Sequence, residues 1–104
     1  MTAVVVTAIF RPKEGAKDAL KGALAEGIPA VHAEPGCELY AIHDADDGTI
    51  VMLEKWTSAA DLQAHSQGAA VSRLNELVEP HMAEPVIVTT MVAIPAGTPQ
   101  QGLF

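Results

Sequence analysis

The sequence is poor in cysteine: Cys37 is the single thiol in 104 residues. One thiol cannot close an internal disulfide, and it cannot supply the thiol pair of a CxxC zinc or redox motif. This scarcity excludes the disulfide-rich secreted class and indicates a reducing compartment. The apolar run from Ala3 to Phe10 lacks a cationic leader and a small-residue cleavage site. We therefore expect a cytoplasmic protein.

Positive charge is also scarce, with six Lys and Arg against thirteen Asp and Glu and a formal net charge of -7. The six cations are scattered along the chain, at positions 11, 13, 17, 21, 55 and 73. Binding along a nucleic-acid backbone needs a row of cations, and so does an anionic membrane surface. No apolar stretch approaches the roughly 20 residues of a membrane span. Nucleic acid and membrane are therefore not expected partners.

Several motifs of cofactor and hydrolase sites are missing. The sequence has no glycine-rich phosphate loop, no GxSxG and no HExxH. Its four histidines, at positions 32, 43, 65 and 81, lack the close spacings that place two metal ligands on one helix face. We therefore expect no metal site and no bound cofactor.

What the chain does have is enough apolar material, 49% of residues, for one core and a single domain over 1–104. β-Branched runs and turn residues predict strands at 4–10, 37–43, 49–56 and 86–94. Helical spacing predicts one helix from 16 to 31, which Pro29 should kink or end early. A capping sequence at Ser58 predicts a short helix carrying Leu62 and His65, which Gly68 separates from a third helix ending at Pro80. Residues 95–104 are a C-terminal tail.

The order strand, helix, strand, strand, broken helix, strand predicts an α+β fold, the ferredoxin-like βαββαβ arrangement with an antiparallel sheet. Its strands are apolar on both faces, as in Val4-Val5-Val6 and Ile50-Val51-Met52-Leu53. Leaving such side chains in water loses roughly 1.5 to 3 kcal/mol each. A second sheet from a partner subunit would remove that loss, so a homodimer is expected. The alternative cover, a ten-residue tail, is too short for four strands.

Three segments carry a family resemblance: 34–43 (EPGCELYAIH), 54–58 (EKWTS) and 62–65 (LQAH). Together they resemble the antibiotic biosynthesis monooxygenase family, including its small quinol monooxygenase-like proteins. The resemblance implies a dimeric α+β barrel with a pocket between each subunit's sheet and helices. It also implies oxygenation of a small phenol-like or quinol-like aromatic by dioxygen. The haem-degrading branch has Asn, Trp and His where this chain has Thr7, His65 and Asn75, so haem is not expected.

Cofactor-free oxygenation requires a dry cavity and a base, because a phenolate can itself pass an electron to dioxygen. His65 is the candidate base; its alternative role is a half-buried histidine bonded to a backbone carbonyl. Trp56 and Tyr40 are candidates for positioning the aromatic ring, although core packing is favoured for both. Thr7 and Asn75 could add polar groups to the cavity.

Glu54 is a carboxylate inside an apolar strand, where burial costs several kcal/mol unless it is partnered. It either pairs across the dimer or serves the pocket, and we favour the structural pairing, with Arg11 or Arg73. Two other functions stay open for the whole protein. One is a non-catalytic small-molecule-binding or stress-response dimer, and the other is an isomerase or decarboxylase that uses the same pocket.

Overall fold

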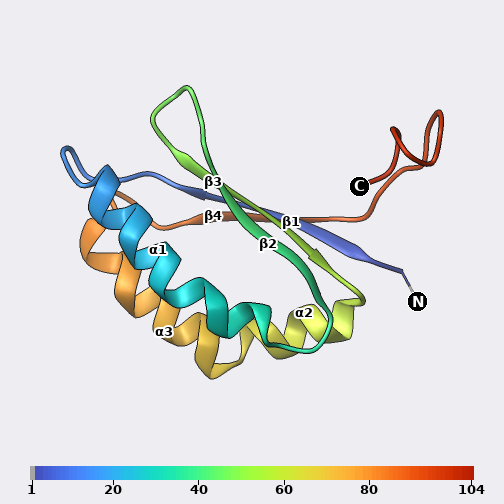
Figure 1. Ribbon diagram of the computed structural model, residues 1–104, viewed down its shortest axis with the longest axis horizontal. Coiled ribbons are helices and arrows are strands. Elements are labelled where there is room, and N and C mark those ends of the chain that lie inside the picture. The colour runs from blue at the N-terminus through green and yellow to red at the C-terminus, as the bar shows by residue number, and fades with distance from the viewer. Residues whose placement is uncertain (1) are drawn as a thin grey trace.

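The computed structural model describes residues 2–104 (Figure 1). Within this range the strands are β1 (Val4–Phe10), β2 (Cys37–Asp44), β3 (Ile50–Trp56) and β4 (Ile87–Met91), and they form one antiparallel sheet in the order β2-β3-β1-β4. The helices are α1 (Lys17–His32), α2 (Ala59–Ser66) and α3 (Ala69–Val78), followed by the 3₁₀ turn η1 (Glu79–His81). All helices lie on one side of the sheet (Figure 1). The predicted ferredoxin-like α+β fold is confirmed.

The core lies between the sheet and the helices. Along β1 and β3, every second residue is buried and the residues between are half-buried. The buried set of β3 is Ile50, Met52, Glu54 and Trp56. Ile50, Met52 and Trp56 pack in one core cluster with Leu20 and Leu24 of α1 and with Leu74 of α3, and all six side chains are at most 1% exposed. Strand alternation thus places one carboxylate, Glu54, on the core face.

The opposite face of the sheet has no helix over it (Figure 1). In the strand register, Thr7 of β1 lies beside Leu53 of β3 and Thr89 of β4, and Ile9 lies beside Val51 and Ile87. β4 is exposed along its whole length. We call the surface that carries Thr7, Ile9, Val51, Leu53, Ile87 and Thr89 the open face.

Element boundaries lie within two residues of the sequence prediction except at the end of the last strand. Of the two effects expected of Pro29, a kink or an early end of the helix, the early end is wrong, because α1 continues to His32. Pro29 stands in the last turn, where the carbonyl that loses its bond belongs to the exposed Ala25 and can be hydrated. The last strand ends at Met91 rather than at 94, because Met91 pairs with Val5 next to the start of β1 and little strand remains to pair with.

The predicted cap of the second helix is confirmed. The Ser58 hydroxyl oxygen accepts a hydrogen bond from the backbone N–H of Asp61 at 3.2 Å, and α2 begins at the next residue, Ala59. Gly68 then stands between α2 and α3 as the N-cap of α3. Across the part of the chain that the structure covers, no helix combines the length and apolar character needed to cross a bilayer.

Candidate active site

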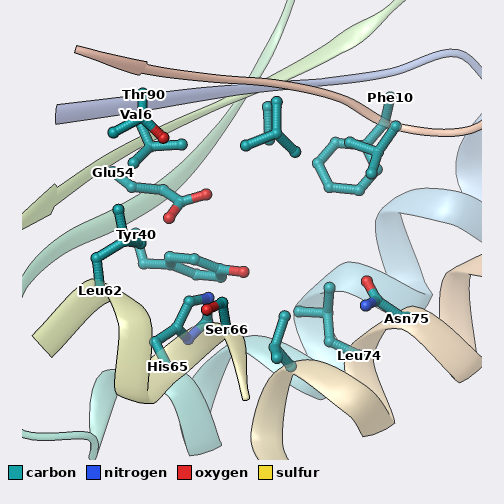
Figure 2. A pocket seen from close by; sticks show the side chains of 14 residues that line it. Val6, Phe10, Tyr40, Glu54, Leu62, His65, Ser66, Leu74, Asn75 and Thr90 are labelled. Carbon is teal, nitrogen blue, oxygen red and sulfur yellow. The ribbon is translucent and has the colours of Figure 1, made fainter. Parts of the chain in front are cut away.

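A cavity of about 340 Å³ lies between the sheet and helices α2 and α3 (Figure 2). Apolar side chains from β1, α3 and the chain near β4 form most of its wall, among them Phe10, Leu74 and Val86. Polar groups come from Tyr40, Glu54, His65, Ser66, Asn75 and Thr90. The cavity is therefore an apolar space with a few polar side chains on its wall, as ligand sites usually are.

His65 stands on the cavity wall at the end of α2 and is 5% exposed. Its Nδ1 lies 2.7 Å from Oε1 of Glu34. The partner is thus a carboxylate and not the backbone carbonyl of the alternative role. A carboxylate can only accept a hydrogen bond, so in a neutral imidazole it holds the proton on Nδ1 and leaves Nε2 as the basic nitrogen.

The remaining nitrogen of His65 faces open space. Across residues 2–104, no fully buried side-chain nitrogen or oxygen lacks a hydrogen-bond partner. Among the described residues, the His65 ring makes one hydrogen bond, through Nδ1, so Nε2 must be accessible, and the space that His65 borders is the cavity. A basic nitrogen open to an apolar cavity is the arrangement that a proton-abstracting base needs.

The loop before β2 brings Glu34 to His65. Gly36 has a φ of +80°, and a Cβ there would collide with the side chain of Asp61. Asp61 is the residue of α2 whose backbone N–H bonds to the N-cap Ser58. The loop therefore packs tightly on the first turn of α2. A Cβ at Gly68 would stand 3.1 Å from Oε2 of Glu34, so the glycine that breaks the helices also leaves room for the carboxylate.

Tyr40, Trp56 and His65 form an aromatic cluster at the part of the cavity wall that contains His65. The Trp56 and His65 ring centroids are 4.5 Å apart, and those of Tyr40 and His65 are 5.4 Å apart in an edge-on arrangement. Trp56 is fully buried and is not part of the cavity wall. Its position fits core packing against His65 and not direct stacking on a substrate.

Tyr40 belongs to the cavity wall, and its hydroxyl points into the space (Figure 2). The side chain is 4% exposed. Burial, with the nearby Glu54 carboxylate as a second cause, raises the pKa of Tyr40 well above its usual range. The hydroxyl therefore stays protonated near neutral pH and can donate a hydrogen bond to an oxygen of a bound molecule.

Glu54 lies across the strand register from Tyr40 and Val6 and is 5% exposed. Within this chain Glu54 pairs with neither Arg11 nor Arg73, because Arg11 pairs with Glu84 and Arg73 with Glu26. The alternation of β3 turns Glu54 toward the helices. A pairing across the dimer stays a prediction.

Its partner is instead the Trp56 indole, whose Nε1–H donates to Glu54 Oε1 at 3.0 Å. Burial raises the pKa of the Glu54 carboxyl, while the hydrogen bond from Trp56 and the charge of His65 act in the opposite direction.

The two remaining predicted residues, Asn75 and Thr7, lie on different faces of the fold. Asn75 of α3 lies on the cavity wall, across the space from His65 (Figure 2). Thr7 does not reach the cavity: it lies on the open face beside Leu53, because its neighbours Val6 and Ala8 are the β1 residues that point to the helices. The expectation that Thr7 contributes to this cavity is corrected. Thr90 of β4, across the register from Val6, is the cavity threonine.

Glu34 is the main site residue that the sequence did not reveal. It is separated from His65 by 31 positions, and no spacing rule joins a loop carboxylate to a histidine on a later helix. For metals, the structure offers no group of three or more His, Cys, Asp or Glu in residues 2–104 that could hold an ion.

A family model described as antibiotic biosynthesis monooxygenase matches residues 3–77. The Mycobacterium tuberculosis protein Rv0793, named as a candidate monooxygenase, is 30% identical over 92 residues, which are 88% of this chain and 91% of that protein. The solved structure of Rv0793 superposes with a TM-score of 0.82, at 28% identity, over 93% of this chain and 100% of that one.

Two further solved structures extend the comparison. Protein SO0527 of Shewanella oneidensis has 30% identity and a TM-score of 0.78 over 88% of this chain and 90% of that one. A Caulobacter crescentus protein described as a candidate antibiotic biosynthesis monooxygenase has a TM-score of 0.81 over 89% of this chain and 91% of that one. At 19% identity, the Caulobacter protein supports the fold alone.

Proposed function

Because the chain belongs to the antibiotic biosynthesis monooxygenase family, we propose that it oxygenates a small phenol-like or quinol-like aromatic with dioxygen and without a bound cofactor. The match over residues 3–77 confirms the resemblance drawn from the three sequence segments. The observation that carries the proposal is the His65 ring, bonded to the Glu34 carboxylate at Nδ1 and open to an apolar cavity at Nε2.

The reaction begins with proton transfer from a substrate hydroxyl to Nε2 of His65. The Glu34 carboxylate stabilises the imidazolium that forms, and the Tyr40 hydroxyl donates a hydrogen bond to the phenolate oxygen. The electron-rich phenolate then passes an electron to dioxygen, and the two radicals combine into a carbon-bound peroxide. The apolar wall around Phe10 and Leu74 admits dioxygen and limits competing water.

Cavity size restricts the substrate. A volume of about 340 Å³ stands at the low end of the roughly 300 to 1,000 Å³ that ligand cavities span. A molecule of one or two fused rings fits this space better than an extended polycyclic one. Asn75, across the cavity from His65, can bond a second oxygen of the same molecule, which favours a para-quinol.

Dioxygen uptake tests the proposal directly. Metal-free protein is mixed with a panel of benzoquinols, naphthoquinols and anthrones, and uptake is compared with the uncatalysed rate. His65→Ala should lose about 10²- to 10⁴-fold, the usual contribution of a general base. Glu34→Gln, which keeps an acceptor and removes the charge, should lose less.

The matched control for these variants is Glu76→Gln, an exposed carboxylate on α3 outside the cavity wall. It should behave like the wild type. Uptake at the background rate, or uptake that survives in His65→Ala, contradicts the proposal. Product formed under anaerobic conditions indicates an isomerase or decarboxylase instead, and a ligand that raises Tm but is recovered unchanged indicates a binding protein.

We further propose that the working unit is a homodimer in which two open faces pack together. The support is apolar exposure: Ile87 is 53% exposed, and Val92 and Ile94, just after β4, are 60% and 86% exposed. On the open face, Leu53 and Val51 of β3 stand beside Thr7 and Ile9 of β1. Apolar patches of this kind mark interaction surfaces, and the family resemblance implies the same packing.

Sedimentation tests the dimer. The wild type should sediment at twice the 10.9 kDa chain mass, and Leu53→Lys should shift the equilibrium to the monomer by placing a charge within the interface. Ala30→Lys, on the exposed side of α1, is the matched control and should remain dimeric. A monomeric wild type at micromolar concentration contradicts the proposal.

A further inference from the structure

We propose that Glu54 is a second acid–base group of the cavity, the proton donor that releases water from the hydroperoxide formed after dioxygen adds to the substrate. This inference rests on the proposed function and assigns proton donation in the second half of the reaction to a residue other than His65.

The carboxyl of Glu54 has one bonded and one open oxygen. Oε1 accepts the hydrogen bond from Trp56, and no other hydrogen bond or ion pair of the described residues involves this carboxyl. Since no fully buried oxygen in residues 2–104 is unpartnered, Oε2 must be accessible. Figure 2 shows the carboxyl directed into the cavity on the side where Tyr40 and His65 lie.

The surroundings favour a proton on this carboxyl. No Lys or Arg of the described chain pairs with Glu54, so desolvation is not offset by a fixed cation. The titratable groups near it are Tyr40 from β2, His65 from α2 with Glu34 behind it, and the Cys37 thiol. Of these, only His65 can be positively charged, and it can return a proton to Glu54 after each turnover.

The chemistry needs two groups of opposite character. For a substrate with a CH₂ group at the reacting carbon, written R₂CH₂, His65 removes one proton and dioxygen adds as a peroxide. The imidazolium returns that proton to give R₂CH–OOH. His65 then takes the second carbon-bound proton while the O–O bond breaks, and the leaving hydroxide takes a proton from Glu54 to form water.

This sequence balances as R₂CH₂ and O₂ giving R₂C=O and H₂O. The carbon is oxidised and dioxygen is reduced, with no other reductant. Transfer of a proton from the His65 imidazolium to the Glu54 carboxylate restores both groups. Trp56 acts as a positioning residue, because its indole N–H stabilises the carboxylate that remains after proton donation.

The first test separates the two halves of the reaction. With a naphthoquinol as substrate, whose keto tautomer has a CH₂ group at the reacting carbon, dioxygen uptake and ketone formation are followed in the same sample. Glu54→Gln, which can still accept the Trp56 hydrogen bond but has no proton to donate, should still take up dioxygen, and its uptake should fall much less than its ketone formation. Ketone formation should fall at least ten-fold, within the general-acid range, and hydroperoxide should accumulate.

Equal losses of uptake and ketone in Glu54→Gln, or no loss of either, overturn the role of Glu54. An absence of uptake in the wild type instead contradicts the proposed function, so the two failures are distinct. Glu76→Gln is again the control and should keep uptake and ketone formation coupled.

The second test does not depend on turnover. Trp56 is the only tryptophan of the chain, and its indole bonds to Glu54 and packs on His65, so its fluorescence reports both groups. A pH titration of the wild type should contain a Glu54 step that persists in His65→Ala and is absent in Glu54→Gln. Its midpoint should lie above the usual value for glutamate of about 4.3. A midpoint at or below that value overturns the proposal even if the variants fold poorly.

Discussion

Helix α1 packs closely on Leu74 of α3 at Gly27, which predicts different effects for two alanine substitutions in one helix. A Cβ built at Gly27 would lie 3.0 Å from Cβ of Leu74 and 3.1 Å from its Cγ and Cδ1. Because the Leu74 Cβ is attached to the backbone, a rotamer change cannot move it away. Gly22 is also in α1 but is exposed, and its added Cβ would meet nothing within 4 Å.

The two effects differ in sign for a simple reason. Replacing an interior helix glycine by alanine stabilises by about 0.5 to 1 kcal/mol, and this gain applies at both positions. At Gly27 alone, overpacking costs about 1 to 3 kcal/mol. Gly22→Ala should therefore be about 0.5 to 1 kcal/mol more stable than the wild type, and Gly27→Ala should be unchanged or up to about 2.5 kcal/mol less stable.

Thermal unfolding followed by circular dichroism measures this difference. At roughly 4 to 8 °C per kcal/mol for a domain of this size, the two variants should differ in Tm by at least about 4 °C. All samples need the same protein concentration, because self-association makes Tm concentration-dependent. Leu74 is also part of the cavity wall, so Gly27→Ala should raise KM while Gly22→Ala leaves it unchanged. An equal rise in Tm for both variants would refute the packing argument.

Three further predictions concern the site and its frame. Ser58→Ala should destabilise the protein by about 0.5 to 2 kcal/mol, measured by urea unfolding, because the N-cap of α2 is lost. Ser72→Ala, at an exposed residue of α3, is the control and should leave the stability unchanged. Burial raises the pKa of the Glu54 carboxyl in the folded state, so the folded protein binds the carboxyl proton more tightly than the unfolded chain does. The free energy of unfolding of the wild type should therefore fall as pH rises from about 4.3, the usual pKa of glutamate, through the raised pKa of Glu54. The Tm of Glu54→Gln relative to the wild type should rise over the same interval, and a constant difference would contradict the burial argument. Tyr40→Phe should lower kcat/KM about ten-fold, within the 2 kcal/mol or so of one hydrogen bond to a charged oxygen. Its Tm should change little, because the hydroxyl has no hydrogen-bond partner among residues 2–104, and a large loss of stability would show a structural role instead.

Much of the fold could be predicted from the order of local signals. β-Branched runs ended by Arg11-Pro12 and by the acidic turn before Thr49 locate strands, and these signals depend only on backbone sterics and turn chemistry. The Ser58 cap and the break at Gly68 are equally local, since they involve residues at most three positions apart. Pro29 does not end α1, because the cost of a proline depends on its place in the helix and on whether water reaches the freed carbonyl.

The sequence alone therefore determined the order of the elements, the apolar character of both sheet faces and the identity of His65 as a candidate base. It could not decide which face of β1 meets the helices, because a strand that is apolar on both sides carries no alternation, and Thr7 was misplaced for this reason. Only the tertiary structure brought Glu34 to His65 and directed the face of β3 that carries Glu54 and Trp56 toward the helices. The Glu34–His65 contact depends on how a loop and a helix pack on the sheet, and such long-range packing leaves no periodic signal along the chain.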